Sequence, residues 1–163
     1  MNKFEKISEK QFKKDVGDFL DIYNAIKLPR RATKYSAGYD IFAPYSITLN
    51  PGETAKVPTA IRVSLDEDKV LLIAPRSGLG FKYRLQLDNT IGVIDSDYYN
   101  SDNEGHFWIK ITNDSRDGKT VVIKQGEAFA QSIIVQYFTT VDDDADGIRN
   151  GGFGSTTEAQ NKP

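Results

Sequence analysis

Asn89-Thr-Ile-Gly-Val-Ile-Asp-Ser-Asp-Tyr98 lies near the middle of this 163-residue chain and joins an apolar segment to acidic and aromatic residues. Its centre, Gly92-Val93-Ile94, is typical of a buried strand. A strand interior that ends on carboxylates indicates that they line a cavity. We therefore predict that Asp95 carries the chemistry. No arginine or lysine stands beside it in sequence, which leaves it free to accept a proton. A turn aspartate that caps a backbone N–H is the alternative.

Short apolar segments separated by turns continue on both sides of this stretch. We predict strands at 41–42, 46–49, 55–65, 70–74, 85–94, 106–112, 120–124 and 128–138, with turns at Pro51-Gly52, Asp66-Glu-Asp68, Asp117-Gly118 and Gln125-Gly126. Gln125-Gly126 stands between two apolar strands and predicts a hairpin. Many short strands without a second helical period indicate an all-β antiparallel sandwich or barrel.

The first 27 residues follow a different pattern. Apolar residues recur at spacings of three and four, which predicts an amphipathic helix from about Glu9 to Ala25. Ser8 and Gln11 fit a capping box, and Ile7 and Phe12 are placed to form a hydrophobic staple. Such a helix either packs on the barrel or serves as a separate partner-binding element. We divide the chain into a helical extension (1–27), a barrel (28–140) and a linker with a C-terminal arm (141–163).

Composition excludes several classes of function. The formal net charge is −2 and the pI about 5.5, so no basic surface indicates direct nucleic-acid binding. The absence of cysteine excludes disulfides, thiolate catalysis and a Cys-based zinc site. His106 is the single histidine, and we interpret it as structural. No apolar run has membrane-spanning length and no signal peptide is evident, so we expect a soluble, cytoplasmic protein.

The C-terminal part is acidic and then rich in glycine. Asp142-Asp-Asp144 and Asp146 lack the spacing of an EF-hand, so we expect a solvated linker. Gly151 to Gly154 supply almost no side chains for a core, which predicts a flexible arm. An exposed Phe153 would be costly to solvate, so we expect it to meet an aromatic ring or a base.

Five short motifs together resemble those of the trimeric dUTP pyrophosphatase (dUTPase) family, bacterial or phage type, in the same order. They are Ala37-Gly-Tyr-Asp40, Pro75-Arg-Ser-Gly-Leu-Gly80, Gly92-Val-Ile-Asp-Ser-Asp-Tyr98, Gly126-Glu-Ala-Phe-Ala-Gln131 and Gly151-Gly-Phe-Gly-Ser-Thr156. The resemblance runs from about residue 28 to 157. It implies a dUTPase-like jelly-roll β-barrel with an extra N-terminal helix and a flexible C-terminal arm. It also implies a homotrimer that hydrolyses dUTP to dUMP and pyrophosphate with Mg²⁺.

The resemblance assigns roles around the third motif. Asp95 would orient the attacking water and act as general base at the α-phosphate. Tyr98 would pack against the deoxyribose and leave no room for a 2′-hydroxyl, which rejects UTP. Asn89 would pair with the uracil edge, because an amide offers both a donor and an acceptor. A hairpin from Asn89 to Tyr98 would be too tight for thymine's methyl group.

The other motifs would hold the phosphates. Arg76 and Gly78 are implied phosphate contacts, and Ser77 is implied at the oxygen that bridges the α- and β-phosphates. Gln131 would contact the α-phosphate and the water, and Asp40 would organise Arg76 and the magnesium water shell. Mg²⁺ in this family is held by phosphates and water, with few or no direct protein ligands.

The arm would complete a site formed by neighbouring subunits. Phe153 would stack on uracil, while Arg149, Ser155 and Thr156 would hold the terminal phosphate. Three features depart from the family pattern: Arg149 lies one residue closer to Gly-Gly-Phe, Ala128 replaces an arginine, and residues 100–104 are inserted before Gly105.

Two other functions stay open at this point. A dCTP deaminase shares the fold, although that activity typically relies on a glutamate that this motif lacks. A regulator that binds a protein repressor, as some staphylococcal phage relatives do, would use the N-terminal helix or the 100–104 loop.

Overall fold

A five-stranded antiparallel sheet carries most of the predicted site residues. In this computed structural model, which describes residues 1–151, its strand order is β2 (Arg30–Arg31), β3 (Tyr39–Phe42), β12 (Ala128–Gln136), β7 (Lys69–Pro75) and β9 (Gly92–Asp95). The neighbouring strands β12 and β7 turn one face toward the core, and along β7 fully buried side chains alternate with partly buried ones. Leu71, Ile73 and Ser132 point from them into the core, where each is buried.

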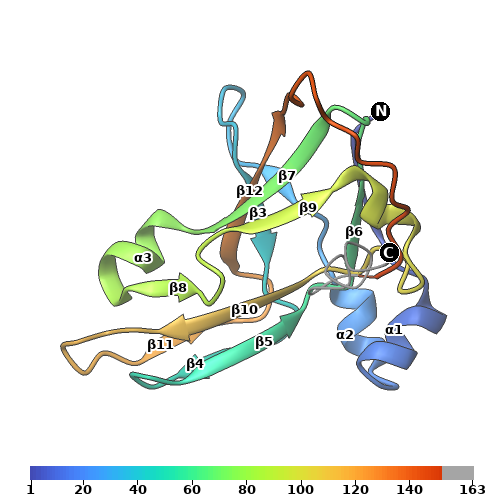
Figure 1. Cartoon of the computed structure of the whole chain (residues 1–163). Helices are drawn as coiled ribbons and strands as arrows, with labels where there is room; N and C mark the ends of the chain where they lie inside the picture. The colour runs from blue at the N-terminus through green and yellow to red at the C-terminus, as the bar shows by residue number, and fades with distance from the viewer. Residues whose placement is uncertain (152–163) are drawn as a thin grey trace.

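A second layer of strands closes the core from the other side (Figure 1). It contains β5 (Thr54–Pro58), β10 (Trp108–Asn113) and β8 (Leu85–Leu87), together with the pair β11 (Val121–Ile123) and β4 (Ile47–Leu49). The largest fully buried side chains lie in the core, among them Phe107, Phe129, Ile41, Ile111 and Ile123. The all-β prediction is therefore confirmed.

The N-terminal prediction was partly wrong. Residues 3–6 form β1 (Lys3–Lys6), which pairs with β6 (Ile61–Ser64). The expected single helix is two helices, α1 (Glu9–Asp15) and α2 (Leu20–Ala25). Between them Gly17 adopts φ 117°, a left-handed conformation that ends a right-handed helix. Phe12 is fully buried, so this segment packs on the barrel.

Local turn chemistry changed several other predicted elements. The predicted strand 55–65 breaks at Ala60 (φ 57°), where the chain passes from β5 to the separate pair of β6 with β1. The predicted strand 85–94 breaks at Thr90 (φ 68°), where the chain passes from the sheet of β8 to that of β9. Gln125-Gly126 does not form a hairpin, since β11 pairs with β4 while β12 pairs with β3 and β7. The helix α3 (Ser77–Tyr83) was not predicted, because two glycines disfavour it.

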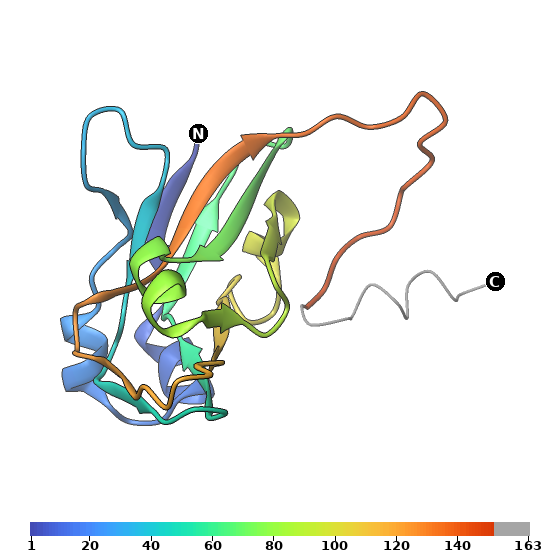
Figure 2. The same cartoon turned by 90° about the vertical axis from the view of Figure 1, so that its left-hand side faces the viewer.

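The C-terminal segment leaves the end of β12 and runs outside the barrel (Figure 2). The acidic residues 142–146 are exposed, as expected of a solvated linker. No helix within residues 1–151 is long and apolar enough to cross a membrane.

Candidate active site

A pocket of about 340 Å³ lies beside β9 and contains most of the third motif. Its volume falls within the range of small-molecule sites. The lining residues include Ile73, Leu87, Asn89, Ile91, Val93, Asp95, Tyr98, Phe107, Trp108 and Arg149. Asp95 ends β9, and the 3₁₀-helix η1 (Ser96–Asn100) begins at the next residue. The carboxylate therefore lies where a strand meets a loop and lines a cavity, as the sequence predicted. The prediction of a buried strand was wrong at Val93, which is 53% exposed, because β9 is the edge strand of the sheet.

Arg149 contacts the carboxylates of both Asp95 and Asp97. Its Nη2 forms an ion pair with Asp95 Oδ2, and its Nε lies 2.8 Å from Asp97 Oδ1. The Asp95 side chain is 42% exposed, so solvent still reaches it. The expectation that no cation restrains Asp95 was therefore wrong for this state of the chain. It was based on sequence neighbours, and Arg149 comes from 54 residues away.

The start of the arm is fixed to the same loop. Asn150 Nδ2 donates to Asp102 Oδ2 over 3.0 Å, and the Gly151 N–H donates to Ser101 Oγ over 3.3 Å. The arm therefore reaches the site of its own chain in this structure. Phe153, Ser155 and Thr156 lie outside the described residues, and their roles stay predictions.

Tyr98 is held in place at its hydroxyl group. The side chain is 5% exposed and lines the pocket. Its hydroxyl donates to the His106 carbonyl over 2.9 Å and accepts from Asn103 Nδ2 over 2.8 Å. Burial raises the pKa of Tyr98, so the phenol stays neutral and can donate at neutral pH.

Asn89 lies in the exposed turn between β8 and β9, at the rim of the pocket. The turn is tight, because the Ile91 N–H donates to the Asn89 carbonyl over 2.7 Å. No hairpin connects Asn89 to Tyr98: β8 pairs with β10 and β9 pairs with β7. That prediction was wrong because the turn joins two layers rather than two neighbouring strands.

A second polar cluster lies at the other end of the sheet. Asp40 Oδ1 lies 3.2 Å from Arg76 Nε, as the resemblance implied. Gln131 stands opposite Asp40 in the pairing of β12 with β3, and its Nε2 donates to the Pro75 carbonyl over 3.1 Å. The first, second and fourth motifs therefore meet around Arg76, which precedes α3 and is half exposed.

Ser77 and Gly78 form the first turn of α3, where backbone N–H groups lack partners within the helix. Nothing lies within 4 Å of the position that a Cβ would take at Gly78. The packing of this chain therefore gives no reason for glycine there. Close approach of an outside group to the backbone does give one.

The two clusters lie on one face of the sheet but far apart. In the pairing register Asp95 stands opposite Val70 and Gln131 opposite Ala74. Four residues along β7 and two strand spacings separate Asp95 from Gln131, which places their backbones about 16 Å apart.

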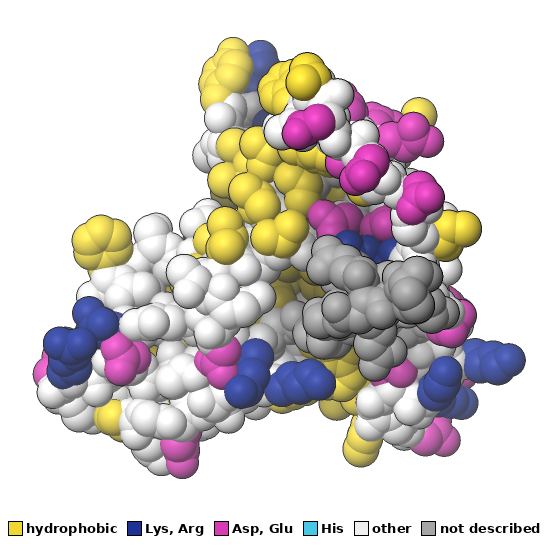
Figure 3. Space-filling view, in the orientation of Figure 1, with side chains coloured by type: hydrophobic (Ala, Val, Ile, Leu, Met, Phe, Trp, Pro, Cys, Tyr) yellow, Lys and Arg dark blue, Asp and Glu magenta, His cyan; other side chains and the backbone are white. Residues whose placement is uncertain are grey.

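Exposed apolar side chains occupy the face between the clusters. Ile133, Leu72 and Val93 form one cross-strand row there. Val93 is 53%, Ile133 41% and Val135 36% exposed. Figure 3 shows hydrophobic side chains gathered over β12, β7 and β9. We call this region the apolar sheet face. Contiguous exposed apolar surface of this kind marks an interaction site.

Sequence reasoning missed three features of the site: the contact of Arg149 with Asp95, the bond from Asn103 to Tyr98, and the apolar sheet face. The sequence did contain a signal for the apolar sheet face. Val70 to Ala74 form a continuous apolar run, which indicates a strand covered on both faces. The first two depend on loops that carry no periodicity.

Comparisons with known proteins place the chain among nucleotide hydrolases. The family model of dUTPase matches residues 24–157. The deoxyuridine 5′-triphosphate nucleotidohydrolase of Lactococcus lactis is 39% identical over 134 residues, which cover 80% of this chain and 88% of that protein.

Solved structures of phage dUTPases share the fold. The dUTPase of phage phi11 of Staphylococcus aureus, described with a structural Mg(II) ion, gives a TM-score of 0.65 at 25% identity and covers 90% of this chain and 97% of its own. The dUTPase of staphylococcal bacteriophage 80alpha is described as controlling transfer of virulence genes. It gives a TM-score of 0.64 at 26% identity, and the match covers 95% of this chain and 97% of that chain. The jelly-roll prediction is therefore confirmed.

Proposed function

This chain belongs to the dUTPase family, and on that basis we propose that it hydrolyses dUTP to dUMP and pyrophosphate with Mg²⁺. The observation that carries the proposal is the pocket beside β9, where Asn89, Asp95 and Tyr98 line one cavity. An amide, a carboxylate and an aromatic ring there match a uracil edge, an attacking water and a sugar.

Asp95 is the general base in this mechanism. It accepts a proton from the water that attacks the α-phosphorus. The Asp95 carboxylate is ion-paired with Arg149 in this structure, so the pair has to open before the carboxylate can bind the attacking water. The phosphates of the substrate provide the competing partner, since a guanidinium binds phosphate in a bidentate manner. Arg149 therefore moves from Asp95 to the terminal phosphate when dUTP binds.

The uracil base and the deoxyribose of the substrate are recognised in the pocket. Asn89 is exposed at the rim, so its amide can pair with N3–H and O4 of uracil. The buried ring of Tyr98 occupies the space that a 2′-hydroxyl would need, and this rejects UTP. Phe153 stacks on the base from the arm.

The phosphates bind at the second cluster. Arg76 supplies a forked cation that Asp40 orients at 3.2 Å. The first-turn N–H groups of Ser77 and Gly78 face an incoming anion, and the Ser77 hydroxyl meets the α,β-bridging oxygen. Gln131 contacts the α-phosphate and the water. Ser155 and Thr156 complete the terminal phosphate site.

The residues present are compatible with Mg²⁺ bound by phosphates and water. Among residues 1–151 no three acidic, histidine or cysteine side chains lie close enough to hold a metal ion. Mg²⁺ dehydrates reluctantly and keeps several waters, so a triphosphate can supply its remaining ligands. When bound, the ion neutralises phosphate charge. Asp40 lies beside Arg76, where its carboxylate can accept hydrogen bonds from the water shell.

The geometry favours sites that two or more chains share. Asp95 and Gln131 both have to reach the α-phosphate, yet about 16 Å separates them within one chain. The apolar sheet face lies between them and is exposed in the single chain. If a second chain packs on this face, its phosphate cluster can approach the first chain's Asp95. A closed ring of three copies repeats this arrangement at three equivalent sites, so we propose a homotrimer.

A regulatory role is the second candidate. It rests on the similarity to the 80alpha dUTPase, which is described as controlling transfer of virulence genes. In this chain a repressor protein would bind to the surface formed by the N-terminal segment and the 100–104 loop. A pull-down with and without a non-hydrolysable dUTP analogue tests this role separately from catalysis.

The enzymatic proposal is tested by pyrophosphate release with Mg²⁺. We expect rapid release from dUTP and slow release from UTP, dTTP and dCTP at equal concentrations. Equal rates on all four nucleotides, or deamination of dCTP, would contradict it.

A further inference from the structure

The inserted loop, residues 100–104, is joined through Asn103 to Tyr98, a residue that lines the pocket. Its Nδ2 donates to the Tyr98 hydroxyl over 2.8 Å and to the His106 carbonyl over 3.1 Å. Its Oδ1 accepts from the Gly105 N–H over 3.1 Å. One side chain thus joins the loop to the hydroxyl of the residue that borders the sugar.

We infer that Asn103 is a positioning residue that fixes the Tyr98 ring and thereby sharpens the discrimination between dUTP and UTP. The hydroxyl is held from two directions, since it also donates to the His106 carbonyl over 2.9 Å. A ring anchored at its outer end cannot tilt away to admit a 2′-hydroxyl. This inference rests on the proposed function, because it takes Tyr98 as the residue that meets the ribose.

The loop is itself rigid enough to act as a support. Glu104 has φ 58° and Gly105 φ 72°, so the chain reverses sharply there. A Cβ at Gly105 would lie 2.8 Å from the Tyr99 Cα and 2.9 Å from the Tyr98 carbonyl. Only glycine permits this close approach, which keeps Asn103 beside the tyrosine.

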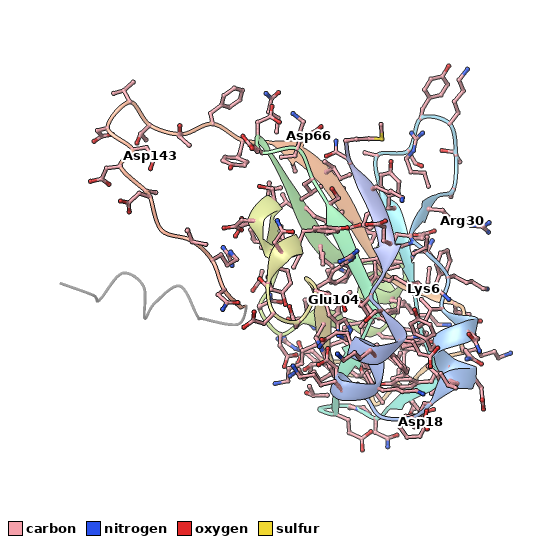
Figure 4. All side chains as sticks on the ribbon, turned by 90° about the vertical axis from the view of Figure 1, so that its right-hand side faces the viewer. Lys6, Asp18, Arg30, Asp66, Glu104 and Asp143 are labelled. Carbon is pink, nitrogen blue, oxygen red and sulfur yellow. The ribbon has the colours of Figure 1, made fainter. Side chains whose placement is uncertain are left out.

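The N-terminal segment anchors the same loop. Glu104 accepts hydrogen bonds from the Ser8 N–H over 2.7 Å and from the Ser8 hydroxyl over 2.6 Å. Ser8 is the N-cap of α1, so the loop is tied to the start of a helix. Figure 1 shows the turn after η1 directly above α1, and Figure 4 labels Glu104 on that turn.

His106 fixes the second anchor of Tyr98. Its ring is fully buried, with Nε2 accepting from the Ala60 N–H over 3.0 Å and Nδ1 lying 2.7 Å from Asp15 Oδ2. The ring therefore carries its proton on Nδ1, which faces the carboxylate of α1. Both anchors of the Tyr98 hydroxyl thus depend on contacts with the N-terminal segment.

A double-mutant cycle on substrate choice tests the inference. The variants are Asn103→Ala, Tyr98→Phe and the double variant, and the quantity is the ratio of kcat/KM for dUTP to that for UTP. Loss of one hydrogen bond predicts a fall of about 3- to 10-fold in this ratio for Asn103→Ala. In the Tyr98→Phe background the same substitution should leave the ratio unchanged, because the hydroxyl is already absent.

Matched variants separate this role from loop stability. Asn103→Ser keeps a hydroxyl that can accept from the Gly105 N–H but is too short to reach Tyr98, so it should behave as Asn103→Ala does while folding normally. Asn100→Ala changes an exposed side chain of the same loop and should leave the ratio unaltered.

Each outcome decides the inference. An unchanged ratio in both Asn103 variants, or an equal fall with and without the Tyr98 hydroxyl, overturns it while the proposed function stands. A wild-type protein without preference for dUTP over UTP overturns the proposed function, and this inference with it.

Discussion

Two inactive variants should restore activity to each other when their chains are mixed. Asp95→Asn removes the proposed base, and Arg76→Ala removes a phosphate ligand from the other cluster. Within one chain these clusters lie about 16 Å apart along the sheet. If each site takes Asp95 from one subunit and Arg76 from the next, a mixed trimer contains sites in which both residues are intact.

The size of the recovery follows from the assembly. A site works when the chain that supplies Asp95 carries Arg76→Ala and the chain that supplies Arg76 carries Asp95→Asn. With equal amounts and random assembly each condition holds with a chance of about one half, so about one quarter of the sites are intact. The mixture should therefore reach about one quarter of the wild-type rate per chain. A site within one chain would recover nothing.

The assay refolds the two variants together from denaturant and measures pyrophosphate release from dUTP. The same variants refolded separately and then combined provide the control, and size-exclusion chromatography confirms equal trimer content. Activity that stays at the level of the separate variants would refute the shared site. It would also leave the apolar sheet face without its proposed role.

Three further predictions concern single chains. Asp95→Asn should retain nucleotide binding, measured by calorimetry with a non-hydrolysable analogue, but lose about 10²- to 10⁴-fold in turnover because an amide cannot accept the proton; near-normal turnover removes Asp95 from the mechanism. Deleting residues 147–163 should barely alter the melting temperature but sharply lower kcat/KM, since Arg149 and the rest of the arm are lost; full activity would show that the arm is dispensable. Burial lowers the pKa of His106, against the opposing effects of Asp15 and Glu104, so the unfolded chain binds a proton that the folded chain excludes. The free energy of unfolding should therefore reach its full value above about pH 6.5 and fall as the pH drops below it. His106→Gln should abolish this pH dependence in urea titrations.

The sequence predicted elements whose own residues determine them. The apolar run at 70–74 became the central strand β7, and the Ser8 side chain accepts from the Gln11 N–H as an N-cap. The prediction of one N-terminal helix was wrong because a single backbone angle, the positive φ of Gly17, divides the segment into two helices. The sequence also did not predict α3, where packing of the partly buried Leu79 and Tyr83 against the core outweighs the poor helix propensity of Gly78 and Gly80.

The sequence named candidate site residues one by one but did not indicate how they are arranged. The resemblance named Asp40 and Arg76, and the structure brings them to 3.2 Å. The contact of Arg149 with Asp95 joins residues 54 positions apart through an arm without periodicity, so no local pattern indicates it. The division into two distant clusters appears only once the strand register is known.

In the proposed reaction, water attacks the α-phosphorus of dUTP, which is held at a site that contains Asp95. Hydrolysis in water labelled with heavy oxygen, under single-turnover conditions with Mg²⁺, tests it directly by mass spectrometry of the products. We expect the label to appear in dUMP and pyrophosphate to carry none. Label in pyrophosphate, or products other than dUMP and pyrophosphate, would contradict it.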